Sequence, residues 1–273
     1  MYFNIESIKN YKQFIAKKVN EKLEPFSINA NHFSIPVMNW LFYLNRSDME
    51  SLDLNKLLGK DQGRGKFITG SNIIDSDLTN HDSSQEEKYY AARDIIDRAS
   101  PFLGALAGET VFRINQFSTP QDRFESISDP KTFGQFYFNM KRPSPMGWAE
   151  IIVHEASHQY LFMLTAKPDF KKEFHWDKKK YSSLRKEDRP LIGILHALIA
   201  QCSMIHLAHG VLNNTFTEEN KKEALELIER LKNGFYQDIS IFDSENGFDN
   251  TNDLLTEYVF ATKKLCQNII NPL

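Results

Sequence analysis

The chain has 273 residues, of which 41% are hydrophobic and 25% are charged. This balance is typical of a globular protein and excludes an intrinsically disordered one. Lysine and arginine number 33 against 36 for aspartate and glutamate, a net charge of −3. Nucleic acid is therefore not the expected partner, because phosphate binding requires a basic surplus. The two cysteines, Cys202 and Cys266, lack CxxC spacing and are expected to be reduced, buried thiols.

No membrane-spanning segment is expected, because no stretch approaches roughly 18 continuous apolar residues. The first residues, MYFNIESIKNYKQF, lack the apolar run and cleavage site of a signal peptide. We therefore expect a cytoplasmic protein. The length suits one large domain or two small ones. We expect a mostly helical region over residues 1–80 and a metal-binding domain over 81–273, or one continuous domain.

The first third of the chain shows three helical patterns and a polar interval. Apolar residues at helical spacing predict a helix over 5–19, and an apolar stretch predicts a buried helix over 36–44. Residues 57–84 are rich in glycine and polar residues, which indicates loops. A capping box at the start of 84–99 predicts a helix there, and the proline at 101 ends or redirects it.

The middle of the chain predicts two strands and a central helix. The segment 109–117 alternates between apolar and polar residues, and 134–140 is rich in aromatic residues, so both favour strands. Residues 146–165 are apolar on nearly every side at helical spacing, which is typical of a buried helix.

Three further helices are predicted in the last third of the chain. Residues 188–209 begin with Asp-Arg-Pro, a helix start, and stop at Gly210. Residues 217–233 stop at Gly234, and the last helix covers 252–269. The predicted fold class is therefore mainly α with a small β-sheet (α+β). In it, the buried helix over 146–165 packs against the helix over 188–209.

The central helix contains the motif HExxH, as His154, Glu155 and His158. Positions i and i+4 share one face of a helix, so both imidazoles can bind one metal ion. Glu155 can then contact a metal-bound water. The flanking residues are apolar, and burying these groups without partners would cost several kcal/mol, about what a polar group loses on leaving water. A metal site is therefore predicted, with a hydrogen-bonded core cluster as the alternative.

A third ligand has to come from elsewhere in the chain. Leu161 and Leu164 stand where a metzincin would have glycine and histidine, which excludes that class. Glu257 could serve as a gluzincin-like ligand, but it is distant in sequence. His196 lies on the next apolar helix and is the preferred third ligand.

Two more histidines, His206 and His209, follow His196 on the same predicted helix. They are expected to contact the ligands or to interact with the helix C-terminus. Two arginines, Arg185 and Arg189, precede His196. A guanidinium binds a carboxylate in two-point fashion, so either arginine could anchor an acidic co-substrate at the metal. The alternative is an exposed, salt-bridged helix start.

These residues resemble a known family. The segments GQFYFNMKRPSPMGWAEIIVHE, HEASHQYLF and YSSLRKEDRPLIGILHALIA are similar to the HExxH-motif peptide-modification proteins associated with ribosomally made, modified peptides. The resemblance covers about residues 85–212. It implies an iron(II)- and 2-oxoglutarate-dependent dioxygenase that hydroxylates side-chain β-carbons of a precursor peptide. It also implies that His154, His158 and His196 bind the iron and that Arg189 or Arg185 binds the distal carboxylate of 2-oxoglutarate.

The ligand set alone leaves other functions open. Three protein ligands leave open positions for a keto acid and oxygen on octahedral iron. The same ligands on tetrahedral zinc leave one position for water, with Glu155 as general base of a metallopeptidase. A non-catalytic scaffold would instead close the site with a fourth ligand, such as His206 or Glu257. The sequence indicates neither the modified residue nor the oligomeric state.

Overall fold

The structure is a computed structural model. The residues that it describes are 5–27, 29–32, 38, 41–42, 83–111, 113–117, 126–128, 134–139, 144–165, 177–182, 186–244, 263–264 and 266–269. The chain divides into two compact units: residues 1–3, 82–105 and 142–273 form unit 1, and residues 4–81 and 106–141 form unit 2. Residues 106–141 thus group with the N-terminal part of the chain.

Unit 2 combines a long helix with a small sheet. Helix α1 (Ile5–Leu23) buries Ile15, Val19 and Leu23, which recur every fourth residue and so share one helix face. Its short 3-10 helices and strands are η1 (Glu24–Phe26), η2 (Ala30–His32), β1 (Arg113–Phe117), β2 (Ser126–Ser128) and β3 (Gln135–Asn139). In the sheet, β3 lies between β1, to which it is parallel, and β2, to which it is antiparallel.

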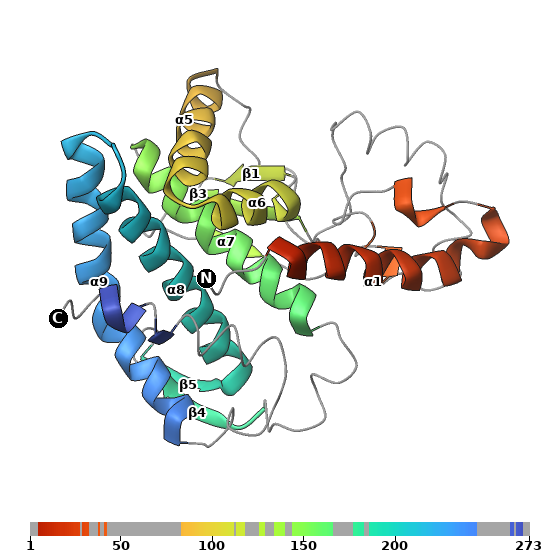
Figure 1. Ribbon diagram of the computed structural model, residues 1–273. Helices are drawn as coiled ribbons and strands as arrows, with labels where there is room; N and C mark the ends of the chain where they lie inside the picture. The colour runs from red at the N-terminus through yellow and green to blue at the C-terminus, as the bar shows by residue number, and fades with distance from the viewer. Residues whose placement is uncertain are drawn as a thin grey trace. The chain divides into compact units, whose positions relative to one another are not determined.

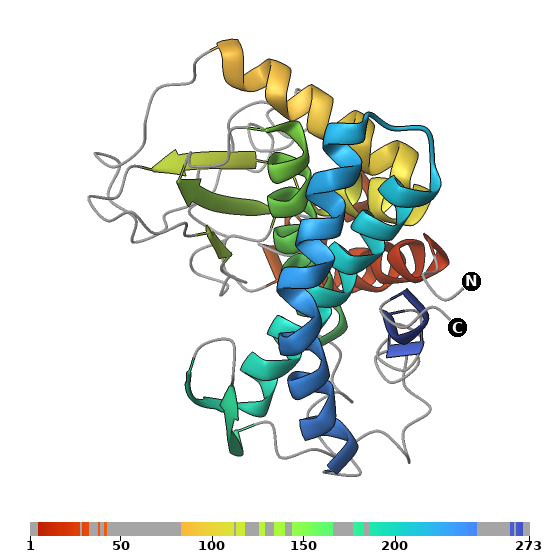
Figure 2. The same cartoon turned by 90° about the vertical axis from the view of Figure 1, so that its left-hand side faces the viewer.

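Unit 1 is a layered set of helices packed around helix α8 (Figure 1). Its elements are α5 (Ser83–Ala99), the start of α6 (Pro101–Thr110), α7 (Pro145–Thr165), β4 (Lys179–Ser182), β5 (Glu187–Pro190), α8 (Leu191–Asn213) and α9 (Glu218–Ser244). Helix α8 packs against α9, α7 and α5, and α7 also packs against α5. Figure 2 shows the β4–β5 hairpin at the N-terminal end of α8. The described residues are mostly helical with small sheets, which confirms the predicted α+β class.

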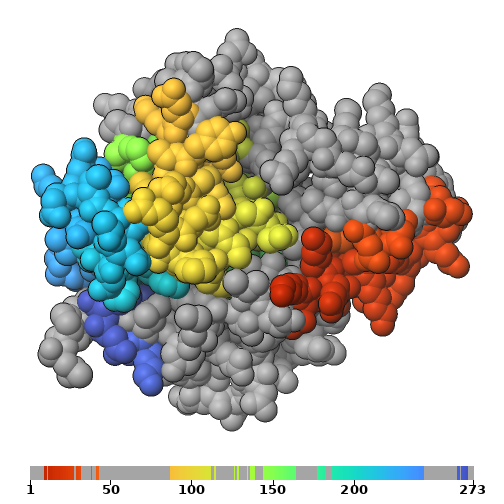
Figure 3. All heavy atoms as spheres, turned by 45° about the horizontal axis from the view of Figure 1, so that its top comes forward, coloured from red at the N-terminus to blue at the C-terminus, as the bar shows by residue number. Residues whose placement is uncertain are grey.

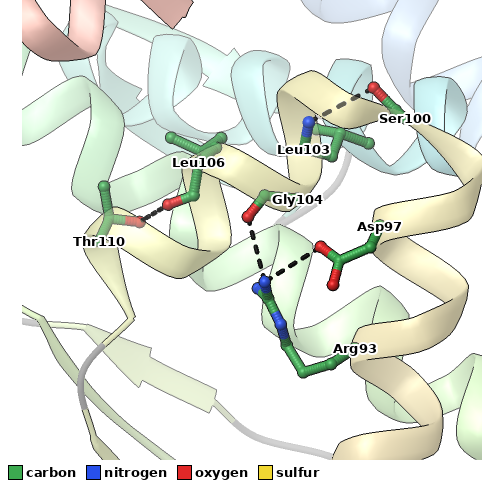
Figure 4. Close-up of polar contacts among 7 residues, drawn as sticks. All are labelled: Arg93, Asp97, Ser100, Leu103, Gly104, Leu106 and Thr110. Carbon is green, nitrogen blue, oxygen red and sulfur yellow. Dashed lines mark hydrogen bonds and ion pairs between the residues drawn. The ribbon is translucent and has the colours of Figure 1, made fainter. Parts of the chain in front are cut away.

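The corner between α5 and α6 is held by polar contacts (Figure 4). The Arg93 guanidinium donates to Asp97 Oδ1 and to the Gly104 carbonyl oxygen, both at 3.1 Å. Ser100 Oγ accepts from the Leu103 amide at 3.3 Å. A side chain at position 104 would place its Cβ 2.4 Å from Asp97 Oδ1, so any larger residue would displace this carboxylate from Arg93.

Several predicted elements agree with the structure and some boundaries move. The helices predicted over 84–99 and 146–165 are α5 and α7. The strand predicted over 109–117 begins only at 113, because its first two residues form the last turn of α6. Of the helix predicted over 36–44, the described residues Met38 and Leu41 are helical and buried. The predicted loops up to residue 82, and most of 252–269, lie outside the described residues.

Two predicted helix stops are wrong. Gly210 and Gly234 lie inside α8 and α9, which continue to Asn213 and Ser244. A Cβ at position 210 would come within 2.3 Å of the Ala99 carbonyl oxygen, and one at 234 within 2.9 Å of Gln201 Oε1. Both glycines therefore serve close helix packing and not chain reversal. Figure 3 shows the end of α8, in cyan, beside the amber-yellow spheres of α5.

The predicted helix start at Asp188-Arg189-Pro190 is also wrong. These residues belong to β5, which pairs antiparallel with β4, and α8 begins only at Leu191. Pro190 has φ −56° and ψ 145°, which suits the end of a strand as well as the residue before a helix. Helix α8 is long and apolar enough to cross a membrane by length and composition, and 78% of its most apolar window is buried within the protein.

Candidate metal centre

Helix α7 carries the HExxH motif, and hydrogen bonds fix its N-terminus. Ser144 precedes its first residue, and Ser144 Oγ accepts a hydrogen bond from the Gly147 amide at 3.0 Å. The same hydroxyl donates to Glu223 Oε2 of α9 at 2.6 Å. Val153, Ala156 and Ser157, which surround the motif, are almost completely buried. The helix therefore holds its histidines on a fixed backbone.

The Nε2 atoms of the two motif histidines face each other. His154 Nε2 and His158 Nε2 are 3.0 Å apart, and the rings meet edge to face with centroids 4.6 Å apart. Two nitrogens bound to one ion at about 2.1 Å would be separated by about 3.0 Å at a right angle and by about 3.4 Å at a tetrahedral angle. The pair therefore fits two neighbouring ligands of one metal ion.

Glu155 lies beside this pair. Its side chain is 1% exposed, whereas that of His154 is 31% exposed. Glu155 Oε1 is 3.8 Å from His154 Nε2. A carboxylate at this distance from a metal-facing nitrogen can hydrogen-bond to a water or a substrate atom that enters the site from the exposed side of His154.

His196 of α8 reaches the other nitrogen of His158. The two Nδ1 atoms are 3.1 Å apart, and the His196 ring also packs against Phe162 at a centroid distance of 5.0 Å. Burial, the Arg189 charge and His154, in decreasing order, lower the pKa of His196 to about 4. His196 is therefore neutral near pH 7, as a ligand or a hydrogen-bond acceptor requires.

The structure thus brings the three predicted histidines together without directing three nitrogens at one point. Among the described residues, no group of three His, Cys, Asp or Glu side chains has the arrangement of a metal site. If His158 bound a metal through Nε2, its proton would sit on Nδ1 and be donated to His196. The role of His196 as third ligand stays a prediction.

Arg189 lies against the first turn of α8, at Gly193, although it belongs to a strand. The register of β4 and β5 pairs it with Lys180 and places it on the same face as Ser182, which is fully buried. Its guanidinium carbon would be 3.5 Å from a Cβ at Gly193, one turn before His196. Its Nε is 3.8 Å from Glu187 Oε1. The other predicted anchor, Arg185, lies outside the described residues.

The remaining predicted histidines do not join His196. His206 follows it by ten residues on a continuous helix, an axial distance of about 15 Å. Burial, and secondarily His209, lower the pKa of His206 to about 4, and burial lowers the pKa of His209. These are signs of histidines held neutral inside the protein. Glu257 lies outside the described residues.

One polar pair near the site was missed by sequence reasoning. Gln201 Nε2 of α8 donates to Asp238 Oδ2 of α9 at 2.7 Å, and both residues are at most 1% exposed. The signal was available, because Asp238 falls on the apolar stripe of α9 that includes Leu231, Phe235 and Phe242. A charged residue on such a stripe indicates a specific polar contact.

No protein-family model matches the chain, and no curated protein is significantly similar to it.

Proposed function

We propose that this protein is an iron(II)- and 2-oxoglutarate-dependent enzyme that hydroxylates a side-chain β-carbon of a ribosomally made precursor peptide. The observation that carries the proposal is the 3.0 Å separation of His154 Nε2 and His158 Nε2 on a zincin-like helix. That separation fits two neighbouring nitrogen ligands of one ion, and octahedral iron would leave open positions for a keto acid and oxygen. The resemblance of the sequence to the HExxH peptide-modification proteins supplies the reaction class.

Each residue of the site then has a distinct task. His154 and His158 hold the iron, with His196 as third ligand or as acceptor from His158 Nδ1. Bound iron supplies the oxygen chemistry, in which the keto acid and O₂ become succinate and CO₂ and one oxygen atom enters a C–H bond of the peptide. Arg189 binds the distal carboxylate of 2-oxoglutarate from strand β5, beside the first turn of α8. Glu155 orients a water or a substrate atom beside His154.

The direct experiment incubates the purified protein with iron(II), 2-oxoglutarate, oxygen and a short peptide encoded beside its gene. We expect a mass gain of about 16 Da on the peptide, equal to one oxygen atom, and an equal amount of succinate. Arg189→Lys should raise the KM for 2-oxoglutarate, because lysine cannot make the two-point contact. Absence of both products with a peptide that binds the protein would refute the proposal.

A zinc metallopeptidase is the second candidate, and the burial of Glu155 beside His154 favours it. A peptidase needs this carboxylate as general base, so Glu155→Gln should remove nearly all turnover. In a hydroxylase the same variant should retain a measurable part of the activity. Independently, the protein is purified without added metal and its metal content is measured. Zinc would favour the peptidase and iron the hydroxylase.

A further inference from the structure

Unit 1 contains a large cleft, and no histidine is among the described residues that line it. The cleft encloses about 1220 Å³ and is partly open to solvent. Its walls are α5, the first turns of α7, the loop after α8 and the first half of α9. Sites for small molecules enclose about 300–1,000 Å³, so this cleft has room for an extended segment of peptide. The apolar part of its lining comes from Ala91, Ile95, Pro145, Met146, Phe216 and Leu227.

Carboxylates outnumber cations around this cleft. Arg98 pairs with Asp94 at 2.9 Å, and Arg230 pairs with Glu150 at 2.7 Å, so each arginine is already neutralised by a carboxylate of the cleft. Three further carboxylates remain, which gives the lining a net charge of −3, equal to that of the whole chain. The five carboxylates are Asp94, Glu150, Glu219, Glu223 and Glu226, and the two arginines are Arg98 and Arg230.

The three further carboxylates all come from α9. Glu219 lies in the first turn, where the helix dipole favours a negative charge. Glu223 lies beyond that turn and accepts from Ser144 at 2.6 Å. Glu226 approaches Lys222 at 4.0 Å in an exposed pair, and such pairs are weak. The cleft therefore keeps a negative potential, which attracts a positively charged ligand.

We propose that this cleft binds a basic, amphipathic segment of a peptide. Its apolar side chains would contact the apolar lining, and its lysines or arginines would face the carboxylates of α9. Glu150 precedes His154 by one turn on the same face of α7, an axial distance of about 6 Å. A peptide bound in the cleft could thus continue towards the candidate metal centre. That this peptide is also the one hydroxylated rests on the proposed function, but its binding to the cleft does not.

The test measures the binding of three short fluorescent peptides to the full-length protein by anisotropy. The first peptide alternates lysine with leucine or alanine, and the other two have glutamine or glutamate in place of lysine. One double variant, Glu219→Gln with Glu226→Gln, removes two carboxylates of the cleft. The matched control, Glu218→Gln with Glu229→Gln, removes two exposed carboxylates of the same helix that do not line the cleft.

We expect the lysine peptide to bind about tenfold more tightly than the glutamine peptide, and the glutamate peptide not to bind. The cleft double variant should raise the Kd of the lysine peptide about tenfold, and the control less than about twofold. Ala91→Phe, which fills part of the cleft without changing its charge, should also raise the Kd.

Three results would overturn the inference: no binding of the lysine peptide, equal effects of the two double variants, or an unchanged Kd in Ala91→Phe. The last two would mean that the peptide is attracted to acidic surface in general and not to the cleft. Cleft-dependent binding by a protein that hydroxylates no peptide would support the inference and count against the proposed function.

Discussion

His158 uses both of its ring nitrogens, and this decides how the candidate site is organised. Its Nε2 faces His154 at 3.0 Å and its Nδ1 faces His196 at 3.1 Å. One nitrogen can therefore bind an ion while the other donates to a neutral acceptor, which fixes the tautomer and the orientation of the ring. HExxH spacing accounts for the first contact. The second depends on where α8 lies, so it has no counterpart in the sequence.

The first prediction separates a metal ligand from its hydrogen-bond partner. His154→Ala and His158→Ala should each abolish stoichiometric iron or zinc binding. His196→Ala should lower the affinity about 10- to 100-fold and still allow saturation, because it removes only the acceptor for His158 Nδ1. The measurement is metal titration of the metal-free protein, with His209→Ala as control. Complete loss of binding in His196→Ala would instead identify His196 as the third ligand.

Individual residues were predicted with uneven success, for physical reasons. His154 and His158 come together because helix geometry alone places positions i and i+4 on one face. Arg189 was expected on a helix and lies on a strand, because its backbone pairs with β4, a contact between residues nine positions apart. Asp238 was overlooked because the helix was predicted to stop at Gly234, which left Asp238 outside the apolar stripe on which it lies.

At the scale of elements, the interior glycines show how packing overrides local signals. A glycine after an apolar run usually marks a helix end. Gly210 instead lies where α8 meets the end of α5, with Ala99 backbone atoms at 2.3 and 2.8 Å from the position of a Cβ. Backbone atoms of a neighbouring helix cannot move aside as the end of a side chain can. The glycine is therefore required by the contact between the two helices.

The second prediction follows from this contact. Gly210→Ala should destabilise the protein by roughly 1–3 kcal/mol, the usual cost of overpacking a core. Gly193→Ala is the matched control on the same helix, because its Cβ would make only ordinary contacts at 3.5 Å with Arg189. Since alanine favours helix by about 1 kcal/mol over glycine, the control should be neutral or stabilising. Denaturant midpoints measure both, and equal midpoints would contradict the packing argument.

The start of α7 offers a third prediction at the same scale. Ser144 Oγ bonds to the Gly147 amide and to Glu223, so it both caps α7 and connects that helix to α9. Ser144→Ala should reduce the free energy of unfolding by about 1 kcal/mol, the typical value of an N-cap. Ser240→Ala serves as control, because this exposed serine donates to the Gln237 carbonyl of its own helix. A variant as stable as the control would show that the cap is dispensable.

At the scale of the whole molecule, stability should depend on pH through buried histidines. His196 and His206 have pKa values lowered to about 4, mainly by burial. In the unfolded chain each histidine binds a proton with an ordinary pKa near 6.5, whereas in the folded protein it does so only near pH 4. Stability is therefore fully present above about pH 6.5 and is lost as the pH falls towards 4.

The fourth prediction isolates one of these groups. His206→Gln should remove the part of the acid destabilisation that belongs to His206, about 3 kcal/mol for a pKa lowered from 6.5 to about 4. Unfolding of the metal-free protein is measured from pH 7.5 to 4, because bound metal would add its own pH dependence. His209→Gln should have a smaller effect, since its side chain is less buried. Parallel curves for wild type and His206→Gln would contradict the assignment.

The sequence by itself determined the features that depend on neighbours along the chain. These are the mainly helical class, the central helix and the pairing of His154 with His158, all of which follow from periodicity within a few residues. Only the tertiary structure decided the hydrogen-bond partner of His158, the strand that carries Arg189 and the pairing of Asp238 with Gln201. Each of these depends on contacts between segments far apart in the chain, and local spacing carries no information about such distances.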